Sequence, residues 1–242
     1  MSKKPVESTK KSSGNNGGRS GATRTSSSGR TARQTGKFHL EFKNVAQKLA
    51  WSTYQQNDVL FLTGPAGTGK SYLAMAFAVN EILQGNKKRI IITRPIVEAG
   101  ESLGFLPGTF EEKVHPYMMP LYDSIYKLVG DDNPQRELID AAIEVAPIAY
   151  MRGRTFDDAI CIFDEAQNSN LKQLKLFLTR FGENSKVIIT GDPSQSDLGG
   201  PVALVEVMAK LESVQSVGMI KFKADSIVRN PLIAKIVERL GE

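Results

Sequence analysis

The fold of this chain is decided by a stretch that runs from Val59 to Ser71 and has the sequence VLFLTGPAGTGKS. Its apolar start is typical of a buried strand, and from Gly64 the residues GPAGTGKS fit the phosphate-loop pattern G-x-x-x-x-G-K-[ST]. Glycine has no Cβ, so this backbone can take positive φ angles and approach a ligand closely. A helix-compatible run, Tyr72–Leu83, follows and would aim backbone N–H groups at phosphate oxygens. The alternative is a glycine-rich strand-to-helix turn that only resembles the pattern.

This loop predicts a nucleotide site with a metal ion. Lys70 would reach the β- and γ-phosphates, and the Ser71 hydroxyl would be a ligand of Mg²⁺. We therefore expect the nucleotide to be bound by a contiguous run of residues: Gly64, Pro65, Ala66, Gly67, Thr68, Gly69, Lys70, Ser71 and Tyr72.

The charge of the chain is unevenly distributed. The 242 residues suit one α/β domain with additions, and they carry a net charge of +5. Residues 1–37 hold nine Lys or Arg against one Glu, a net +8, so the remainder carries −3. This segment is rich in Ser and Gly and poor in large apolar residues, which predicts a disordered basic arm. Such an arm would contact phosphate backbones or only keep the protein soluble.

The sequence gives no sign of a targeting segment. No run approaches eighteen consecutive apolar residues, so we expect no membrane-spanning helix and no membrane partner. The polar N-terminus lacks the apolar stretch of a secretory signal. Cys161 is the single cysteine and lies in an apolar run, which predicts a buried side chain in a reducing compartment. We therefore expect a cytoplasmic protein.

Apolar runs and helical periodicities alternate along residues 38–242, which predicts a mostly parallel sheet flanked by helices. Residues 96–116 contain three glycines and would form a long connection of a kind that is commonly functional. The expected strands cover residues 59–62, 90–92, 145–150, 159–163, 187–189 and 217–222, and the expected helices cover 42–54, 72–83, 117–129, 134–144, 171–178, 202–211 and a last segment from 231.

Polar residues follow several expected strands, and in parallel sheets ligands bind at the carboxyl ends. Asp164 would bind Mg²⁺ directly or contact one of its ligands, and Glu165 would accept a proton from the attacking water. The alternative is a pair of solvated acids at a helix start. Gln195 would sense the γ-phosphate or position water, or it has no role in the site. Arg94 would serve a substrate rather than the nucleotide.

Arg229 lies in the run DSIVRNP near the C-terminus. An arginine that reaches the developing charge of phosphoryl transfer raises the rate by several orders of magnitude. From its spacing alone, a surface arginine beside a helix is the favoured interpretation.

The motifs resemble, in order, those of the PhoH-like ATPases: GPAGTGKS, TRPIVEAGESLGFLPG, YMRGRTFDDA, FDEAQN, ITGDPSQSDL and DSIVRNP. The resemblance covers residues 38–242, and the combination is specific. It implies a RecA-like P-loop NTPase core similar to the first motor domain of superfamily 1 helicases. It also implies an ATPase domain over residues 38–242, with the basic arm as an addition particular to this chain.

The resemblance implies roles residue by residue. Lys70 and Ser71 contact phosphate and Mg²⁺, Asp164 and Glu165 are the metal and hydrolysis carboxylates, and Gln195 senses the γ-phosphate. It further implies Arg229 as an arginine finger and Gln47 as the glutamine that reads adenine.

The chain has length for one motor domain, so an Arg229 finger would act in cis or reach a neighbouring subunit. The resemblance favours a homo-oligomeric ring, a hexamer. We expect ATP hydrolysis coupled to single-stranded RNA or DNA. The alternative is a regulatory nucleotide-binding ring that docks nucleic acid or a protein without unwinding.

Overall fold

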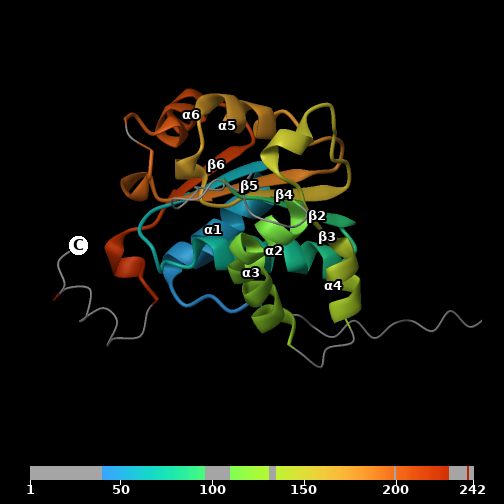
Figure 1. Ribbon diagram of the computed structural model, residues 1–242. Coiled ribbons are helices and arrows are strands. Elements are labelled where there is room, and N and C mark those ends of the chain that lie inside the picture. The colour runs from blue at the N-terminus through green and yellow to red at the C-terminus, as the bar shows by residue number, and fades with distance from the viewer. Residues whose placement is uncertain (1–39, 96–109, 131–134, 199, 229–238, 240–242) are drawn as a thin grey trace, which may run out of the picture. The chain divides into compact units, whose positions relative to one another are not determined.

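The computed structural model describes residues 40–95, 110–130, 135–198, 200–228 and 239 (Figure 1). The expected arm over residues 1–37, the greater part of the 96–116 connection, Arg229 and the start of the last helix at 231 lie outside these residues.

The centre of the molecule is a six-stranded sheet in which all neighbouring strands are parallel, in the order β3-β2-β4-β5-β1-β6. The strand β5 separates the phosphate-loop strand β1 from the acidic strand β4, so Ile189 pairs with Phe61 on one side and Phe163 on the other. All carboxyl ends therefore meet at one edge. The strands are β1 Val59–Thr63, β2 Arg89–Thr93, β3 Ile143–Val145, β4 Ala159–Phe163, β5 Lys186–Gly191 and β6 Val217–Lys221.

Helices cover both faces of this sheet (Figure 1). Successive side chains of a strand point to opposite faces, so Leu60 and Leu62 join one core while Val59 and Phe61 join the other. The predicted α/β class is confirmed. One face carries α1 Val45–Gln56, α2 Lys70–Leu83, α3 Phe110–Val129 and α4 Arg136–Ala142, and the other carries α5 Leu171–Leu178 and α6 Ala203–Leu211.

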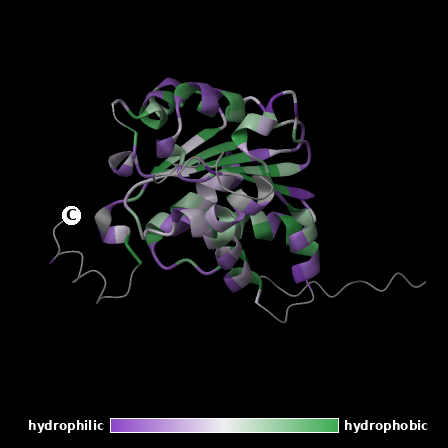
Figure 2. Ribbon diagram, in the orientation of Figure 1, coloured by the Kyte–Doolittle hydropathy of each residue, from purple (hydrophilic) through white to green (hydrophobic). Residues whose placement is uncertain are grey.

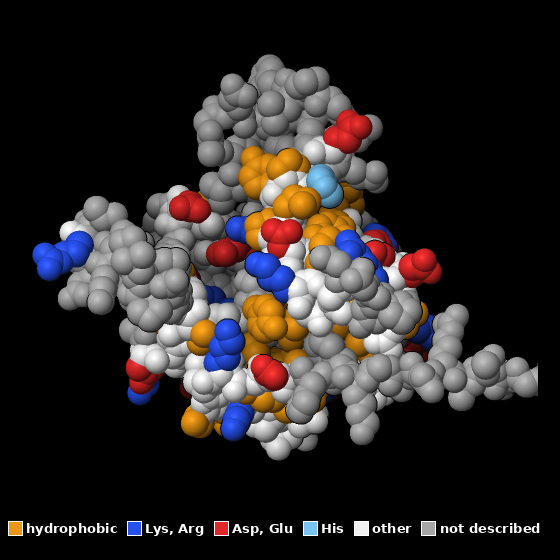
Figure 3. Space-filling model, turned by 90° about the horizontal axis from the view of Figure 1, so that it is seen from below, with side chains coloured by type: hydrophobic (Ala, Val, Ile, Leu, Met, Phe, Trp, Pro, Cys, Tyr) orange, Lys and Arg blue, Asp and Glu red, His pale blue; other side chains and the backbone are white. Residues whose placement is uncertain are grey.

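Hydropathy follows the same layers. The strands consist mostly of hydrophobic residues, whereas the helices and loops also carry many hydrophilic ones (Figure 2). From below, apolar side chains are exposed among both acidic and basic ones (Figure 3). Cys161 is buried in β4 as predicted, and burial raises the pKa of its thiol to about 12. Of the helices described, none is both long and apolar enough to span a membrane.

The helix α3 corrects the sequence prediction. We expected a connection up to residue 116, but the helix begins at Phe110 and includes Pro116 and Pro120. Each proline removes a backbone donor and would weaken an isolated helix. Tertiary burial outweighs this cost, because one face of α3 is buried in the core shared with α2. That face consists of Val114, Met118, Leu121, Ile125 and Val129.

The edge strand β3 is a second correction. We expected a strand over residues 145–150, whereas β3 spans only Ile143–Val145 and pairs with β2 alone. Pro147 has no N–H to donate to a ladder, and the chain turns there into a short 3₁₀ helix, η1 Ile148–Met151. The preceding helix α4 accordingly ends at Ala142 rather than near residue 144.

Candidate active site

The loop between β1 and α2 needs glycine for steric reasons. Gly64, Gly67 and Gly69 all have positive φ, at 133°, 79° and 88°. A Cβ on Gly64 would lie 2.4 Å from the carbonyl oxygen of Phe222, which follows β6. Gly69 is the N-cap of α2, so the first free N–H groups of that helix face the loop. The result is a backbone cradle at a helix N-terminus, which suits an anion.

Lys70 lies folded over this cradle. Its Nζ donates to the carbonyl oxygens of Gly64 at 2.6 Å and Pro65 at 2.9 Å, and the residue is only 9% exposed. The hydroxyl of Thr68 donates to the same Pro65 carbonyl at 3.0 Å and tightens the loop. A buried ammonium beside neutral carbonyls is well placed to bind a phosphate.

Asp164 joins three elements at the end of β4. It is 1% exposed, and its Oδ1 accepts hydrogen bonds from Ser71 Oγ at 2.6 Å and Thr190 Oγ1 at 2.5 Å. Ser71 belongs to α2 and Thr190 to β5, so the carboxylate ties the loop helix to both strands. Adjacent hydroxyl and carboxylate oxygens are the ligands that Mg²⁺ prefers.

The donor set therefore fits Mg²⁺, which needs only one or two protein oxygens beside phosphate and water. Among the described residues, no group of three or more His, Cys, Asp or Glu side chains is placed to hold a metal.

Glu165 has a strained backbone and a restrained side chain. Its φ of 53° is uncommon for a residue with a Cβ. Its Oε2 accepts a hydrogen bond of 2.6 Å from Gln167 Nε2, and Gln167 Oε1 accepts one of 3.0 Å from the backbone N–H of Asp192. Gln167 is 2% exposed. It therefore links the Glu165 carboxylate to the end of β5.

Arg94 contacts the acidic pair, and its expected role toward a substrate rather than the nucleotide stays a prediction. Its guanidinium nitrogens lie 3.8 Å from Asp164 Oδ2 and 3.8 Å from Glu165 Oε1. A third contact, 3.5 Å long, runs from Arg94 Nη1 to the backbone carbonyl of Tyr117 in α3. One side chain thus contacts both acids and a separate helix.

One pocket of about 200 Å³ brings most of the predicted residues together. Glu165 and Gln195 line it together with residues of the loop, and Gln195 lies in the short 3₁₀ helix η3 Pro193–Gln195. Tyr72 lines the pocket too, and burial together with the nearby Glu41 raises the pKa of its hydroxyl. The loop residues that line it are Ala66, Gly67, Gly69, Lys70 and Ser71.

Gln47 is hydrogen-bonded to the phosphate loop. It is 4% exposed; its Oε1 accepts from the backbone N–H of Lys43 at 2.8 Å, and its Nε2 donates to the Thr68 carbonyl at 3.2 Å. Its amide group therefore already binds the α1 terminus and the phosphate loop. It does not line the 200 Å³ pocket.

The C-terminal segment also contacts the loop. The backbone N–H of Val228 donates to the Gly67 carbonyl at 2.9 Å, and Asn44 Nδ2 donates to the Ser226 carbonyl at 3.2 Å. Arg229 itself lies outside the described residues.

Sequence reasoning assigned no role to Gln167 or Thr190. Both stand at strand ends that it had singled out, Gln167 in the run DEAQ and Thr190 in TGDPSQ. Their polar side chains beside expected catalytic residues were the available signal. Only the spatial proximity of β4 and β5 reveals what these side chains bind.

Comparison with known proteins identifies the family of this chain. The family model described as PhoH-like protein matches residues 39–240. The chain belongs to the PhoH-like family. This PhoH-like chain is 50% identical over 201 residues to a PhoH-like protein of Bacillus subtilis, covering 82% of this chain and 63% of that protein. It is 41% identical over 194 residues to the protein PhoH of Escherichia coli, covering 78% and 55% of the two chains. The PhoH-like chain thus spans little more than half the length of these relatives.

Among solved structures, the PhoH-like fold is similar to the large terminase of a thermophilic bacteriophage. The TM-score is 0.56 at 12% identity, over 84% of this chain and 51% of that one. This likeness is one of fold, and it agrees with the predicted parallel sheet flanked by helices.

Proposed function

We propose that this chain binds Mg²⁺ and ATP on the loop 64–71 and hydrolyses the ATP, and that hydrolysis is coupled to handling of single-stranded RNA or DNA. One observation carries the proposal of ATP hydrolysis, and the coupling to nucleic acid rests on the family resemblance. Lys70, Glu165 and Gln195 line one pocket, and Asp164 is hydrogen-bonded to Ser71 in that pocket. A catalytic carboxylate, a polar sensor and a buried lysine around a helix N-terminus are the parts that phosphoryl transfer requires.

Each residue then has a role. Lys70 would exchange its carbonyl contacts for phosphate oxygens, and Glu165 would accept the proton of the attacking water. Ser71 and Asp164 would hold Mg²⁺, which when bound neutralises charge on the phosphates. Gln167 would keep the Glu165 carboxylate in place, and Gln195 would contact the γ-phosphate.

Preference for adenine, read by Gln47, is part of the proposal and is supported by family membership. The same holds for an arginine finger at Arg229 and for a hexameric ring. The finger would act in cis or reach a neighbouring subunit. Native mass measurement with and without ATP would test the ring.

The test of hydrolysis compares the wild-type protein with Glu165→Gln. We expect turnover to fall about 10²- to 10⁴-fold, since the general base is lost, while bound ATP is retained. Glu206→Gln, an exposed carboxylate on α6, is the matched control and should keep wild-type turnover. Equal turnover in wild type and Glu165→Gln would remove the mechanism.

Coupling to nucleic acid is tested in the same assay by adding single-stranded RNA at two salt concentrations. Stimulation that weakens at high salt supports binding through phosphate charges. Absence of stimulation by RNA and DNA alike would favour the regulatory nucleotide-binding ring.

A further inference from the structure

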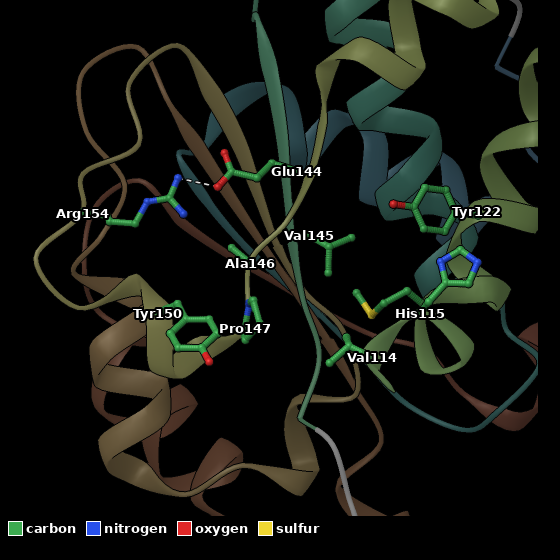
Figure 4. A pocket seen from close by; sticks show the side chains of 10 residues that line it. Val114, His115, Tyr122, Glu144, Val145, Ala146, Pro147, Tyr150 and Arg154 are labelled. Carbon is green, nitrogen blue, oxygen red and sulfur yellow. Dashed lines mark ion pairs between the residues drawn. The ribbon is translucent and has the colours of Figure 1, made fainter. Parts of the chain in front are cut away.

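A second cavity, of about 570 Å³, lies where β3 ends, at the same carboxyl edge of the sheet (Figure 4). His115 and Tyr122 of α3 line one side, and Pro147, Tyr150 and Arg154 line the other (Figure 4). We call it the α3 pocket. It shares no lining residue with the pocket at the phosphate loop.

The side chains of the α3 pocket suit a flat ring. Tyr150 is 59% exposed and offers an aromatic ring at the surface. On the opposite side the rings of His115 and Tyr122 lie with centroids 6.0 Å apart. Val145 and Ala146 at the end of β3 add an apolar surface between them. Every nucleobase has a π-face, so any base of a single strand can stack on such rings, whatever the sequence of that strand.

The charge beside these rings favours a nucleic acid over an apolar peptide. Arg152 and Arg154 follow Tyr150 closely in the chain, and Arg152 is exposed. Arg154 is held by an ion pair with Glu144, and its guanidinium lies 4.6 Å from the ring centre of Phe156. Arg154 is thus already paired, and Arg152 is the arginine offered to a phosphate. An aromatic ring with an arginine close by in the chain is a combination that binds single strands, since the ring takes a base and the arginine takes a phosphate.

Arg94 connects this pocket to the acidic pair. The guanidinium that faces Asp164 and Glu165 also contacts the backbone carbonyl of Tyr117. Tyr117 lies between His115 and Met118, which both line the α3 pocket. A group bound in the pocket would therefore contact α3, the same helix that Arg94 contacts.

We propose that the α3 pocket holds one unstacked base of a single-stranded RNA or DNA, with Arg152 on an adjacent phosphate. The proposal rests on the function proposed above, because it names where that function's nucleic acid binds.

The test is fluorescence anisotropy with labelled 12-residue oligo-U and oligo-T on the full chain. Tyr150→Ala should lower affinity between about 5-fold and 100-fold, the loss expected when one stacking platform is removed. Tyr150→Phe keeps the ring and should keep wild-type affinity. Replacing the bases by abasic sites should weaken binding to the wild-type protein more than binding to Tyr150→Ala.

The charge contribution is tested by salt dependence. Arg152→Ala should lower the slope of log affinity against log salt by about one unit, as expected for one lost phosphate contact. Lys88→Ala is the control, because Lys88 is exposed at the amino end of β2, on the opposite edge of the sheet.

The outcomes separate this inference from the ATPase proposal. Wild-type affinity in Tyr150→Ala would overturn the α3 pocket, as would a wild-type protein that binds neither oligonucleotide. ATP turnover without nucleic acid should be unchanged in Tyr150→Ala. If the wild-type protein does not hydrolyse ATP but Tyr150→Ala still lowers oligonucleotide affinity, the ATPase proposal fails and the pocket stands.

Discussion

Two cavities open at the same edge of one sheet, and they differ in how their side chains are held. At the phosphate loop, Lys70 and Asp164 are buried and hydrogen-bonded within the chain. In the α3 pocket, Tyr150 and His115 are exposed rings. A site for phosphate needs charges fixed in advance, because preorganised groups need no reorganisation during reaction. A site for a base needs only flat surfaces, which tolerate many sequences.

The largest expected effect separates the two cavities. Lys70→Ala should lower ATP turnover about 10²- to 10³-fold, since it removes one preorganised positive group from the phosphates. Oligonucleotide affinity, measured without ATP, should stay within about twofold, because Lys70 lies outside the α3 pocket. Steady-state turnover and anisotropy check the two halves. A parallel loss of both would show that the cavities act as one site.

The second prediction concerns how rigidly the loop is built. Gly64→Ala should lower the free energy of unfolding by about 3 kcal/mol, because the new Cβ meets the Phe222 carbonyl at a positive φ. Gly85→Ala is the control: its φ is also positive, but its Cβ would meet nothing within 4 Å, so a loss of about 1 kcal/mol is expected. Urea unfolding measures both. Equal losses of unfolding free energy in the two variants would mean that the close approach of Gly64 to Phe222 does not exclude a Cβ.

The smallest expected effect tests the link between the cavities. Arg94→Lys keeps the positive charge but loses the planar fork that contacts acids and helix together. We expect the ratio of RNA-stimulated to unstimulated turnover to fall about tenfold, within the usual range of coupling energies. Oligonucleotide affinity in the absence of ATP should change little. An unchanged stimulation ratio would leave the two cavities uncoupled through this residue.

The accuracy of the sequence prediction differed between elements for physical reasons. Strands such as β4 were predicted within a residue. A strand of a parallel sheet is buried on both faces, so an uninterrupted apolar run indicates it directly. The start of α3 was wrong, since Pro116 locally indicates a helix end and only packing on α2 outweighs it. The length of β3 was also wrong, because Val145–Tyr150 has strand-like residues but Pro147 cannot pair.

Some site features were determined by the sequence alone. The loop 64–71 has glycine, lysine and serine at the spacings of a phosphate-loop pattern, which is local in the chain, and Asp164 and Glu165 directly follow a strand end. These features depend on residues that are adjacent in the chain, so the sequence is sufficient to predict them.

Other features were decided only by the tertiary structure. Gln167 bridges Glu165 to β5, Arg94 contacts two acids and a helix, and the α3 pocket combines α3 with a turn that follows β3. These arrangements depend on the strand order β3-β2-β4-β5-β1-β6, which places segments distant in sequence side by side. No local pattern encodes that order, because it arises from packing of the whole sheet.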